Sequence, residues 1–263
     1  MQINKSYFKF RNVLLISGLI IITSLIFCLY LNSNRYSPKI FLWAWERPEN
    51  LLFIDNKNIG VAFYAGIITF SDSEIFFKPR LQLLAIDSEI YKIAVIRIET
   101  ENKEKGSQLN NSQLSKAVDL IVRTCSQNKI SGCQIDFDAK SLEINFYKDL
   151  ILKTRDNLPK SIPLSITALV SWCHLGSWLE DLPIDEAVPM FFRLGVDEYI
   201  IRNNLVGESF MKTAICQKSI GISIDEPLPQ SKYLKNRRIY IFNPDSWTLE
   251  DFSNIIKEIE EKL

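Results

Sequence analysis

The chain has 263 residues, of which 47% are hydrophobic, and its 31 basic and 31 acidic side chains leave a formal net charge of zero. This composition excludes a disordered protein, and the balanced charge gives no electrostatic reason to expect a nucleic-acid partner. The nine glycines form neither of the glycine-rich loops that hold nucleotide phosphates, and the single histidine excludes a zinc site built on several histidines, so we expect no cofactor.

The first apolar segment, residues 13–31, contains 19 residues without a charge. An α-helix rising ~1.5 Å per residue needs about 20 apolar residues to cross a bilayer, so this segment predicts a transmembrane anchor. Basic residues precede it, which favours a cytoplasmic N-terminus for residues 1–12 and a periplasmic or extracellular location for the rest. A cleaved signal peptide is the alternative, but the sequence after Tyr30 lacks its small-residue cleavage pattern.

After a linker, residues 32–39, the remaining chain alternates β-rich runs with helical patterns over residues 40–263. Eight runs predict strands, at 40–46, 60–70, 91–99, 133–138, 164–171, 187–193, 220–225 and 238–243. Four stretches predict helices, at 112–127, 142–158, 175–182 and 248–262. Such alternation is typical of parallel β–α units, and eight of them predict an α/β fold, a compact (β/α)₈ barrel of the TIM type. An irregular stretch after the second strand indicates that some helices are reduced, and a doubly wound open sheet is the alternative.

Ionisable residues gather at the carboxyl ends of the predicted strands, where barrels of this type hold their active sites. Side chains alternate along a strand, so Gln134, Asp136 and Asp138 share the face that points into the barrel. Two inward carboxylates are costly unless they are paired or used. Arg97 and Glu99 share one face of the preceding strand, so we expect Arg97 to pair with Asp136.

Two neighbouring acids cannot easily both ionise, so the pKa of one is raised, and that acid can protonate a leaving oxygen. We therefore interpret Asp138 as a general acid and Asp136 as its partner, a pair that glycosidic bond cleavage requires. Strand ends also carry aromatic and polar candidates for binding the sugar, namely Trp45, Trp172, Trp247, Arg193 and Asp225. The alternatives are a structural ion pair of Asp136 with Arg97, ordinary packing of the tryptophans, and a Mg²⁺ or Ca²⁺ site at the two acids.

Four cysteines follow the apolar segment: Cys125, Cys133, Cys173 and Cys216. An oxidising compartment would permit disulfides, but Cys133 is expected to be a buried thiol. The spacing alone assigns no pairing.

The run from Gly132 to Asp138, GCQIDFD, resembles the fourth-strand signature D-G-x-D-x-D-x-E of chitinase-like, substrate-assisted glycoside hydrolases. Asp136 matches the middle aspartate, Asp138 stands where the catalytic glutamate would be, and Gln134 replaces the first aspartate. The resemblance implies that the acids of this strand carry the chemistry. A shorter aspartate in place of the glutamate moves the acid by ~1 Å or more.

A second motif of that family, M-x-Y-D, is matched only at Met190, which the resemblance makes a binding candidate. Phe192 and Arg193 replace the tyrosine and aspartate that support the acetamido group of the substrate, so the resemblance does not extend to chitin cleavage. Trp247 is similar in position to the sugar-stacking tryptophan of the family.

The segments WAWER, QIDFDA, LSITALVSWC and VPMFFRLG resemble more closely a bacterial family of unknown function that is grouped with glycosidase-type barrels. This resemblance spans Phe41 to about Trp247 and implies the barrel fold. Together these patterns predict a membrane-anchored, glycoside-hydrolase-like barrel that acts on or binds an envelope or extracellular glycan. The alternative is a non-catalytic glycan-binding or envelope scaffold protein.

Overall fold

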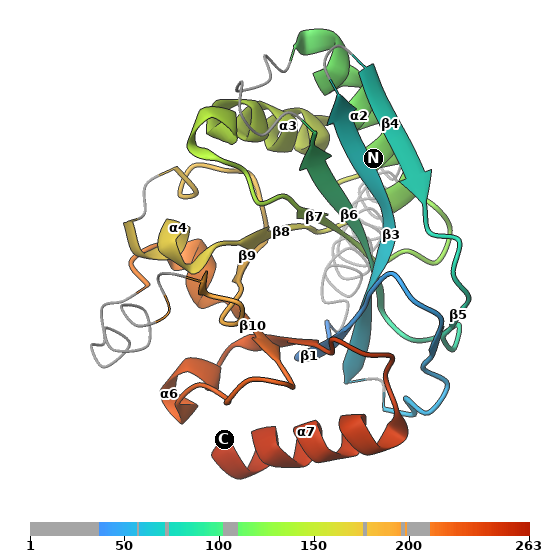
Figure 1. Ribbon diagram of the computed structural model, residues 1–263, viewed down its shortest axis with the longest axis vertical. Coiled ribbons are helices and arrows are strands. Elements are labelled where there is room, and N and C mark those ends of the chain that lie inside the picture. Colours follow the sequence, from blue (N-terminus) through green and yellow to red (C-terminus); the bar gives the residue numbers. More distant parts are fainter. Residues whose placement is uncertain are drawn as a thin grey trace, which may run out of the picture. The chain divides into compact units, whose positions relative to one another are not determined.

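Eight parallel strands form the centre of the computed structural model, which describes residues 37–56, 58–71, 74–101, 110–175, 178–195, 198 and 211–263 (Figure 1). The strands are β1 (Ile40–Ala44), β3 (Ile59–Ser71), β6 (Lys92–Thr100), β7 (Gly132–Asp136), β8 (Leu164–Ala168), β9 (Glu186–Pro189), β10 (Ser219–Ser223) and β11 (Arg238–Phe242). Their order in the sheet is β10-β11-β1-β3-β6-β7-β8-β9. Met190, directly after β9, bridges to Gly221 of β10, so the sheet is nearly closed as a barrel. The order never reverses, as it would in a doubly wound sheet.

Helices follow several of these strands and lie outside the sheet (Figure 1). Three of them agree closely with the predicted bounds: α2 (Asn111–Cys125), α3 (Ile144–Asn157) and α7 (Leu249–Lys262). Capping boxes begin α2 at Asn110 and α7 at Thr248, where side chains satisfy the free backbone N–H groups of the first turn. The shorter helical elements are η1 (Ser141–Glu143), α4 (Val170–Leu175), η3 (Ala214–Gln217) and α6 (Ser231–Leu234).

Two connections depart from a regular (β/α)₈ arrangement. After β3 the chain forms β4 (Glu74–Pro79), which pairs antiparallel with β3. β2 (Glu49–Asn50), which follows β1, pairs with β5 (Leu84–Ala85) in a separate small sheet. In the described parts of these two connections the chain therefore carries strands where a regular barrel would carry helices.

The helix expected at 175–182 is wrong. Strand β8 ends at Ala168 instead of continuing to residue 171, and α4 begins at Val170. Residues 178–181 form turns. The run from Leu164 to Trp172 contains neither glycine nor proline, so neither of these residues marks the change from strand to helix.

Apolar side chains pack on both faces of the barrel strands. The larger cluster lies between strands and helices and includes Cys133 and Ile135 of β7. A smaller cluster fills the barrel interior and includes Phe41, Trp43, Val95, Val188 and Tyr240. The predicted alternation along β7 is confirmed, because Gln134 and Asp136 lie inside the barrel, where they bond to Trp43 of β1 and Thr167 of β8.

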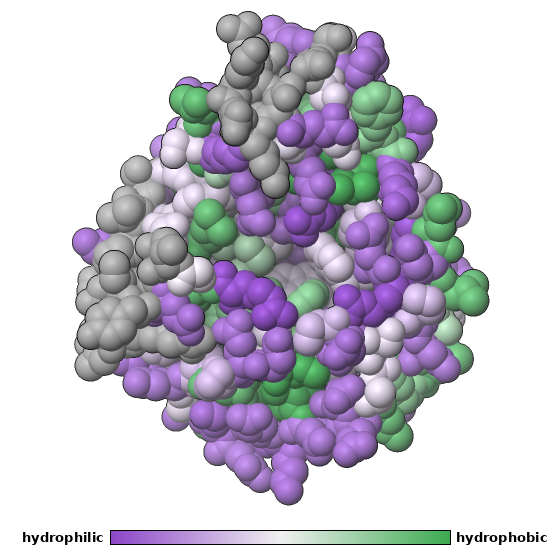
Figure 2. All heavy atoms as spheres, in the orientation of Figure 1, coloured by the Kyte–Doolittle hydropathy of each residue, from purple (hydrophilic) through white to green (hydrophobic). Residues whose placement is uncertain are grey.

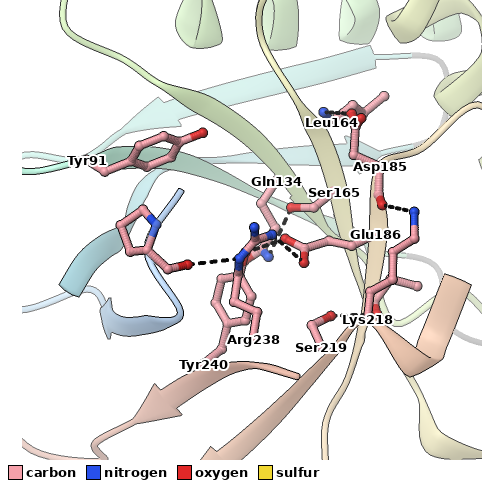
Figure 3. A network of polar contacts seen from close by, with 12 residues as sticks. Tyr91, Gln134, Leu164, Ser165, Asp185, Glu186, Lys218, Ser219, Arg238 and Tyr240 are labelled. Carbon is pink, nitrogen blue, oxygen red and sulfur yellow. Dashed lines mark hydrogen bonds and ion pairs between the residues drawn. The ribbon is translucent and has the colours of Figure 1, made fainter. Parts of the chain in front are cut away.

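A polar network closes the barrel interior at the amino ends of the strands (Figure 3). Glu186, at the start of β9, is 4% exposed and accepts a hydrogen bond from the Tyr240 hydroxyl at 2.5 Å. Arg238, at the start of β11, pairs with the other oxygen of Glu186 at 2.7 Å and donates to the Pro38 carbonyl. Each oxygen of this buried carboxylate thus has a donor, as a buried charge requires.

The contacts group Pro38–Leu263 into one unit. The predicted anchor, residues 13–31, lies outside the described residues, as do residues 1–12 and the first part of the linker. Within the described ranges, no helix combines the length and apolar character needed to span a membrane.

Candidate functional site

A cavity of about 370 Å³ lies at the carboxyl ends of the parallel strands. Its polar lining consists of Arg97, Asp136, Asp138, Thr167, Ser171 and Arg193. Aromatic rings line the remaining wall together with aliphatic side chains: Trp43, Trp45, Phe192 and Phe242. Figure 2 shows a hollow in this face of the molecule with hydrophilic side chains around it. Its volume is in the range of small-molecule sites, and its few polar groups converge on an apolar wall.

Asp136, the last residue of β7, lies deep in this cavity and is 6% exposed. Its Oδ1 accepts a hydrogen bond from the Thr167 hydroxyl at 2.7 Å, and its Oδ2 lies 3.5 Å from an Arg97 guanidinium nitrogen. Burial, followed by the charge of Asp138, raises the pKa of Asp136 to about 6. The expected pairing of Arg97 with Asp136 is confirmed.

Asp138 lies two residues beyond Asp136 and is exposed. Although its side chain reaches solvent, the surrounding protein atoms raise the pKa of this carboxyl above its ordinary value, while the positive charge of Arg97 opposes the rise. No hydrogen bond or ion pair joins Asp138 to another residue in the part of the chain that the structure describes. It is therefore a carboxyl group available to a ligand.

Arg97 is fixed from three sides. Its Nε donates to the Glu99 carboxylate at 2.8 Å, its terminal nitrogen faces Asp136, and its guanidinium carbon lies 5.9 Å from the ring centroid of Trp45. A guanidinium over an aromatic ring is a favourable cation–π contact. The arginine therefore orients one acid and one aromatic ring of the same cavity.

Arg193 also lines the cavity, and its backbone has an unusual conformation. Its φ of 53° is left-handed, which is uncommon for a residue other than glycine. Its backbone N–H donates to Glu226 at 2.8 Å, and its guanidinium contacts Asp225 at 3.0 Å and Glu226 at 3.7 Å. A hydrogen bond from Ser223, and then Arg193, lowers the pKa of Asp225. The two acids thus fix the direction of the guanidinium.

The aromatic wall is a connected set of rings. Phe192 and Phe242 stack with their centroids 5.5 Å apart and their planes 4° apart. Trp45 contacts Phe242 edge to face at 6.3 Å. Trp43 lies deeper, is 3% exposed, and donates its indole N–H to Gln134 at 2.8 Å. Phe242 lies two positions after Tyr240 on β11, so the two side chains share one face of the strand. Strand alternation could therefore have predicted that Phe242 faces the barrel interior, although Phe242 was not among the predicted site residues.

Six of the residues predicted for the site line this cavity: Arg97, Asp136, Asp138, Trp45, Met190 and Arg193. Two others contact them without lining it, since Glu99 holds Arg97 and Asp225 holds Arg193. Gln134 is fully buried and joins Trp43 to the Ser165 hydroxyl. Sequence alternation placed Arg97 and Asp136 on the inner face of the barrel, where the register of β6 and β7 pairs them directly.

The other two predicted tryptophans lie away from the cavity lining. Trp172, in α4, packs against Tyr147 at 6.3 Å and Trp178 at 5.0 Å. Trp247 is 5% exposed, and its indole N–H donates to the Trp43 carbonyl at 2.9 Å. Both therefore pack against protein groups in this structure.

A disulfide joins Cys173 of α4 to Cys216 of η3. Val170 and Ser171 of the same helix line the cavity, so the disulfide fixes one wall of the site. Cys125 and Cys133 are buried free thiols, as expected for Cys133. The described residues contain no group of three or more histidine, cysteine or carboxylate side chains arranged to hold a metal ion.

No family model matches this sequence, and no curated protein matches it significantly. The resemblance to a bacterial family of unknown function therefore has no support from family models. Among solved structures, the spore cortex-lytic enzyme SleL of Bacillus cereus is similar over 71% of this chain, at 12% identity and a TM-score of 0.45. The match covers 50% of that enzyme, so the chain spans about half its length.

Proposed function

We propose that the barrel binds a glycan in the cavity at its carboxyl end and cleaves a glycosidic bond, with Asp138 as the general acid and Asp136 as its partner. One observation carries the proposal: a buried and an exposed carboxyl group, both with raised pKa, face the same aromatic-walled cavity. Perturbed carboxyl groups in a cavity are candidates for acid–base chemistry.

The division of roles follows from exposure. Asp138 reaches solvent and has no hydrogen-bond or ion-pair partner among the described residues, so we assign it the role of donating a proton to the leaving oxygen of a bound sugar. Asp136 cannot leave its position between Thr167 and Arg97, and its negative charge can stabilise the positive charge that develops on the sugar ring. The charge of Asp138 also contributes to the raised pKa of Asp136.

Sugar binding is supported by the wall opposite the acids. Trp45 and the stacked pair of Phe192 and Phe242 offer flat apolar faces, against which the C–H face of a pyranose can pack. Met190 and Arg193 complete this wall. Trp172 and Trp247 have no part in the proposal, since they do not line the cavity.

The proposal places the barrel outside the cytoplasm, tethered to the lipid bilayer through residues 13–31 with the N-terminus inside. The apolar segment and its basic flank support this placement. The Cys173–Cys216 disulfide supports it independently, because disulfides persist in oxidising compartments and are rare in the cytosol.

A non-catalytic glycan-binding protein is the second candidate. It is favoured by the bonding of Asp136, since both of its oxygens already face protein partners, as they would in a purely structural ion pair. In that case the aromatic wall binds the glycan and the acids only stabilise the barrel.

The Asp138→Asn variant separates the two candidates. The unaltered protein and the variant are tested on a broad panel of oligosaccharides for cleavage, by chromatography of the products, and for binding, by calorimetry. We expect the variant to bind as before and to lose at least about 100-fold in turnover, the effect of removing a general acid. Full turnover in the variant would contradict the role of Asp138, and binding without turnover in the unaltered protein would favour the second candidate.

A further inference from the structure

The charges around the cavity are unbalanced. Among the residues that line it in the described chain, the cationic side chains are Arg97 and Arg193, and each already contacts two acids. Asp136 and Glu99 hold Arg97, Asp225 and Glu226 hold Arg193, and Asp138 adds a carboxyl group without such a partner. Two guanidinium and two carboxyl groups line the cavity itself. Together with Glu99, Asp225 and Glu226, which contact the arginines without lining the cavity, this group of seven residues carries three more negative than positive charges when all are ionised.

The titration of Asp136 is consistent with this excess. After burial, the largest influence that raises its pKa is the charge of Asp138, and Glu99 acts in the same direction. Thr167 and Arg97 oppose them without bringing the pKa back to its ordinary value. A second negative group brought by a ligand would meet the same repulsion, and at each arginine it would compete with the two acids already in contact with the guanidinium.

The aromatic wall adds a second feature that favours a cation. Ring faces carry negative electrostatic potential and attract a cation, most strongly in a site that excludes water. Trp45, Phe192 and Phe242 line the same cavity as Asp138, so a ligand inside it can contact ring faces and a carboxyl group together.

We propose, on the basis of the glycan-binding function above, that the cavity takes a sugar that bears a free protonated amine, and selects it over N-acetylated and carboxylated sugars. The amine neutralises part of the excess negative charge, whereas an acetylated nitrogen carries no charge and a uronate adds a negative one.

The test measures binding by calorimetry with the full-length chain in a neutral detergent, at neutral pH and low ionic strength. The three probes are tetramers of glucosamine, N-acetylglucosamine and galacturonate. We expect the glucosamine tetramer to bind about tenfold or more tightly than the acetylated one, and the advantage to shrink at high salt because screening weakens charge interactions. The uronate tetramer should bind most weakly.

A pair of matched variants tests whether the advantage comes from the charges at the cavity. Glu99→Gln removes one exposed acid beside Arg97, and Glu258→Gln removes one from the exposed side of α7. The ratio of glucosamine to N-acetylglucosamine affinity should fall about two- to fivefold in the first variant and stay unchanged in the second.

Equal affinity for the two amino-sugar probes, or preference for the uronate, would overturn the amine selectivity and leave glycan binding intact. An equal fall of the ratio in both variants would also overturn it, since the selectivity would then come from the overall charge. Failure of all three probes and of the wider oligosaccharide panel would instead overturn the proposed function itself, and the amine selectivity with it.

Discussion

Arg97 and Asp136 occupy directly paired positions on the neighbouring strands β6 and β7, and their side chains meet inside the barrel at 3.5 Å. The strand register therefore sets the ion pair, and the ion pair sets the orientation of the acid at the floor of the cavity. Arg97 is one-third exposed and Asp136 is almost fully buried, so the ion pair joins a buried carboxylate to a guanidinium that reaches solvent.

Replacing Asp136 with Asn should stabilise the protein at neutral pH. The folded-state pKa of about 6 lies above the ordinary value of 3.8, so folding makes the ionised carboxylate less favourable. This cost is present above pH 6 and disappears as the pH falls towards 4, because both states are then protonated. We expect a gain of about 1–3 kcal/mol in the free energy of unfolding at pH 7.5 that shrinks towards pH 4.5, measured by urea denaturation.

The matched control is Asp119→Asn, on the exposed side of α2. It should change the free energy of unfolding little at any pH in this range. A gain in the Asp136 variant that is the same at pH 4.5 and pH 7.5 would show that the carboxyl titrates normally in the folded protein.

Replacing Gly221 with Ala should disturb the floor of the cavity. A Cβ atom at this position would lie 2.9 Å from the Trp43 ring, which is too close for an ordinary contact. The indole must shift and strain its hydrogen bond to Gln134, so we expect a loss of about 1–3 kcal/mol and a changed tryptophan emission spectrum. Gly132→Ala, where the tightest contact of the added Cβ is Cγ1 of Ile93 at 3.2 Å, should cost less.

The strands of the barrel were predictable because each is a short apolar or alternating run bounded by polar residues. The small strand β4 was missed although Ile75 and Phe77 alternate with exposed neighbours, since the stretch after the second predicted strand was expected to be irregular. Residues inside regular strands, such as Asp136 and Arg97, could be placed on a face by counting positions. The burial of Trp247 depends on its hydrogen bond to Trp43, 204 residues away, and no local pattern indicates that contact.

The Cys173–Cys216 disulfide could not be predicted either, because cysteine spacing does not determine pairing. It closes a loop with a sequence separation of 43 residues that includes β9 and the cavity residues after it. Replacing both cysteines with Ala should lower the free energy of unfolding by about 2–4 kcal/mol. Dithiothreitol should destabilise the unaltered protein similarly and leave the double variant unchanged; an equal effect on both proteins would mean that this bond contributes no stability.

The Tyr240→Phe variant should lower the stability of the protein without changing the candidate site, because the two lie at opposite ends of the barrel strands. The Tyr240 hydroxyl donates to the buried Glu186 at the amino ends of the strands (Figure 3). Its removal leaves a buried carboxylate with one donor fewer, so we expect a loss of about 1–3 kcal/mol in the free energy of unfolding at neutral pH. Ligand affinity of the cavity should not change, because Asp136 and Asp138 lie at the carboxyl ends.

A matched variant shows how much of the loss comes from the hydrogen bond to Glu186 and how much from removing a tyrosine hydroxyl. The Tyr233 hydroxyl is also buried but has no hydrogen-bond partner within the described residues, so Tyr233→Phe should be neutral or slightly stabilising. Equal losses in the two variants, measured by urea denaturation, would show that the bond to Glu186 contributes nothing. A loss of ligand affinity in folded Tyr240→Phe protein would show that the network at the amino ends acts on the cavity as well, since the interior cluster that contains Phe41 and Trp43 connects them.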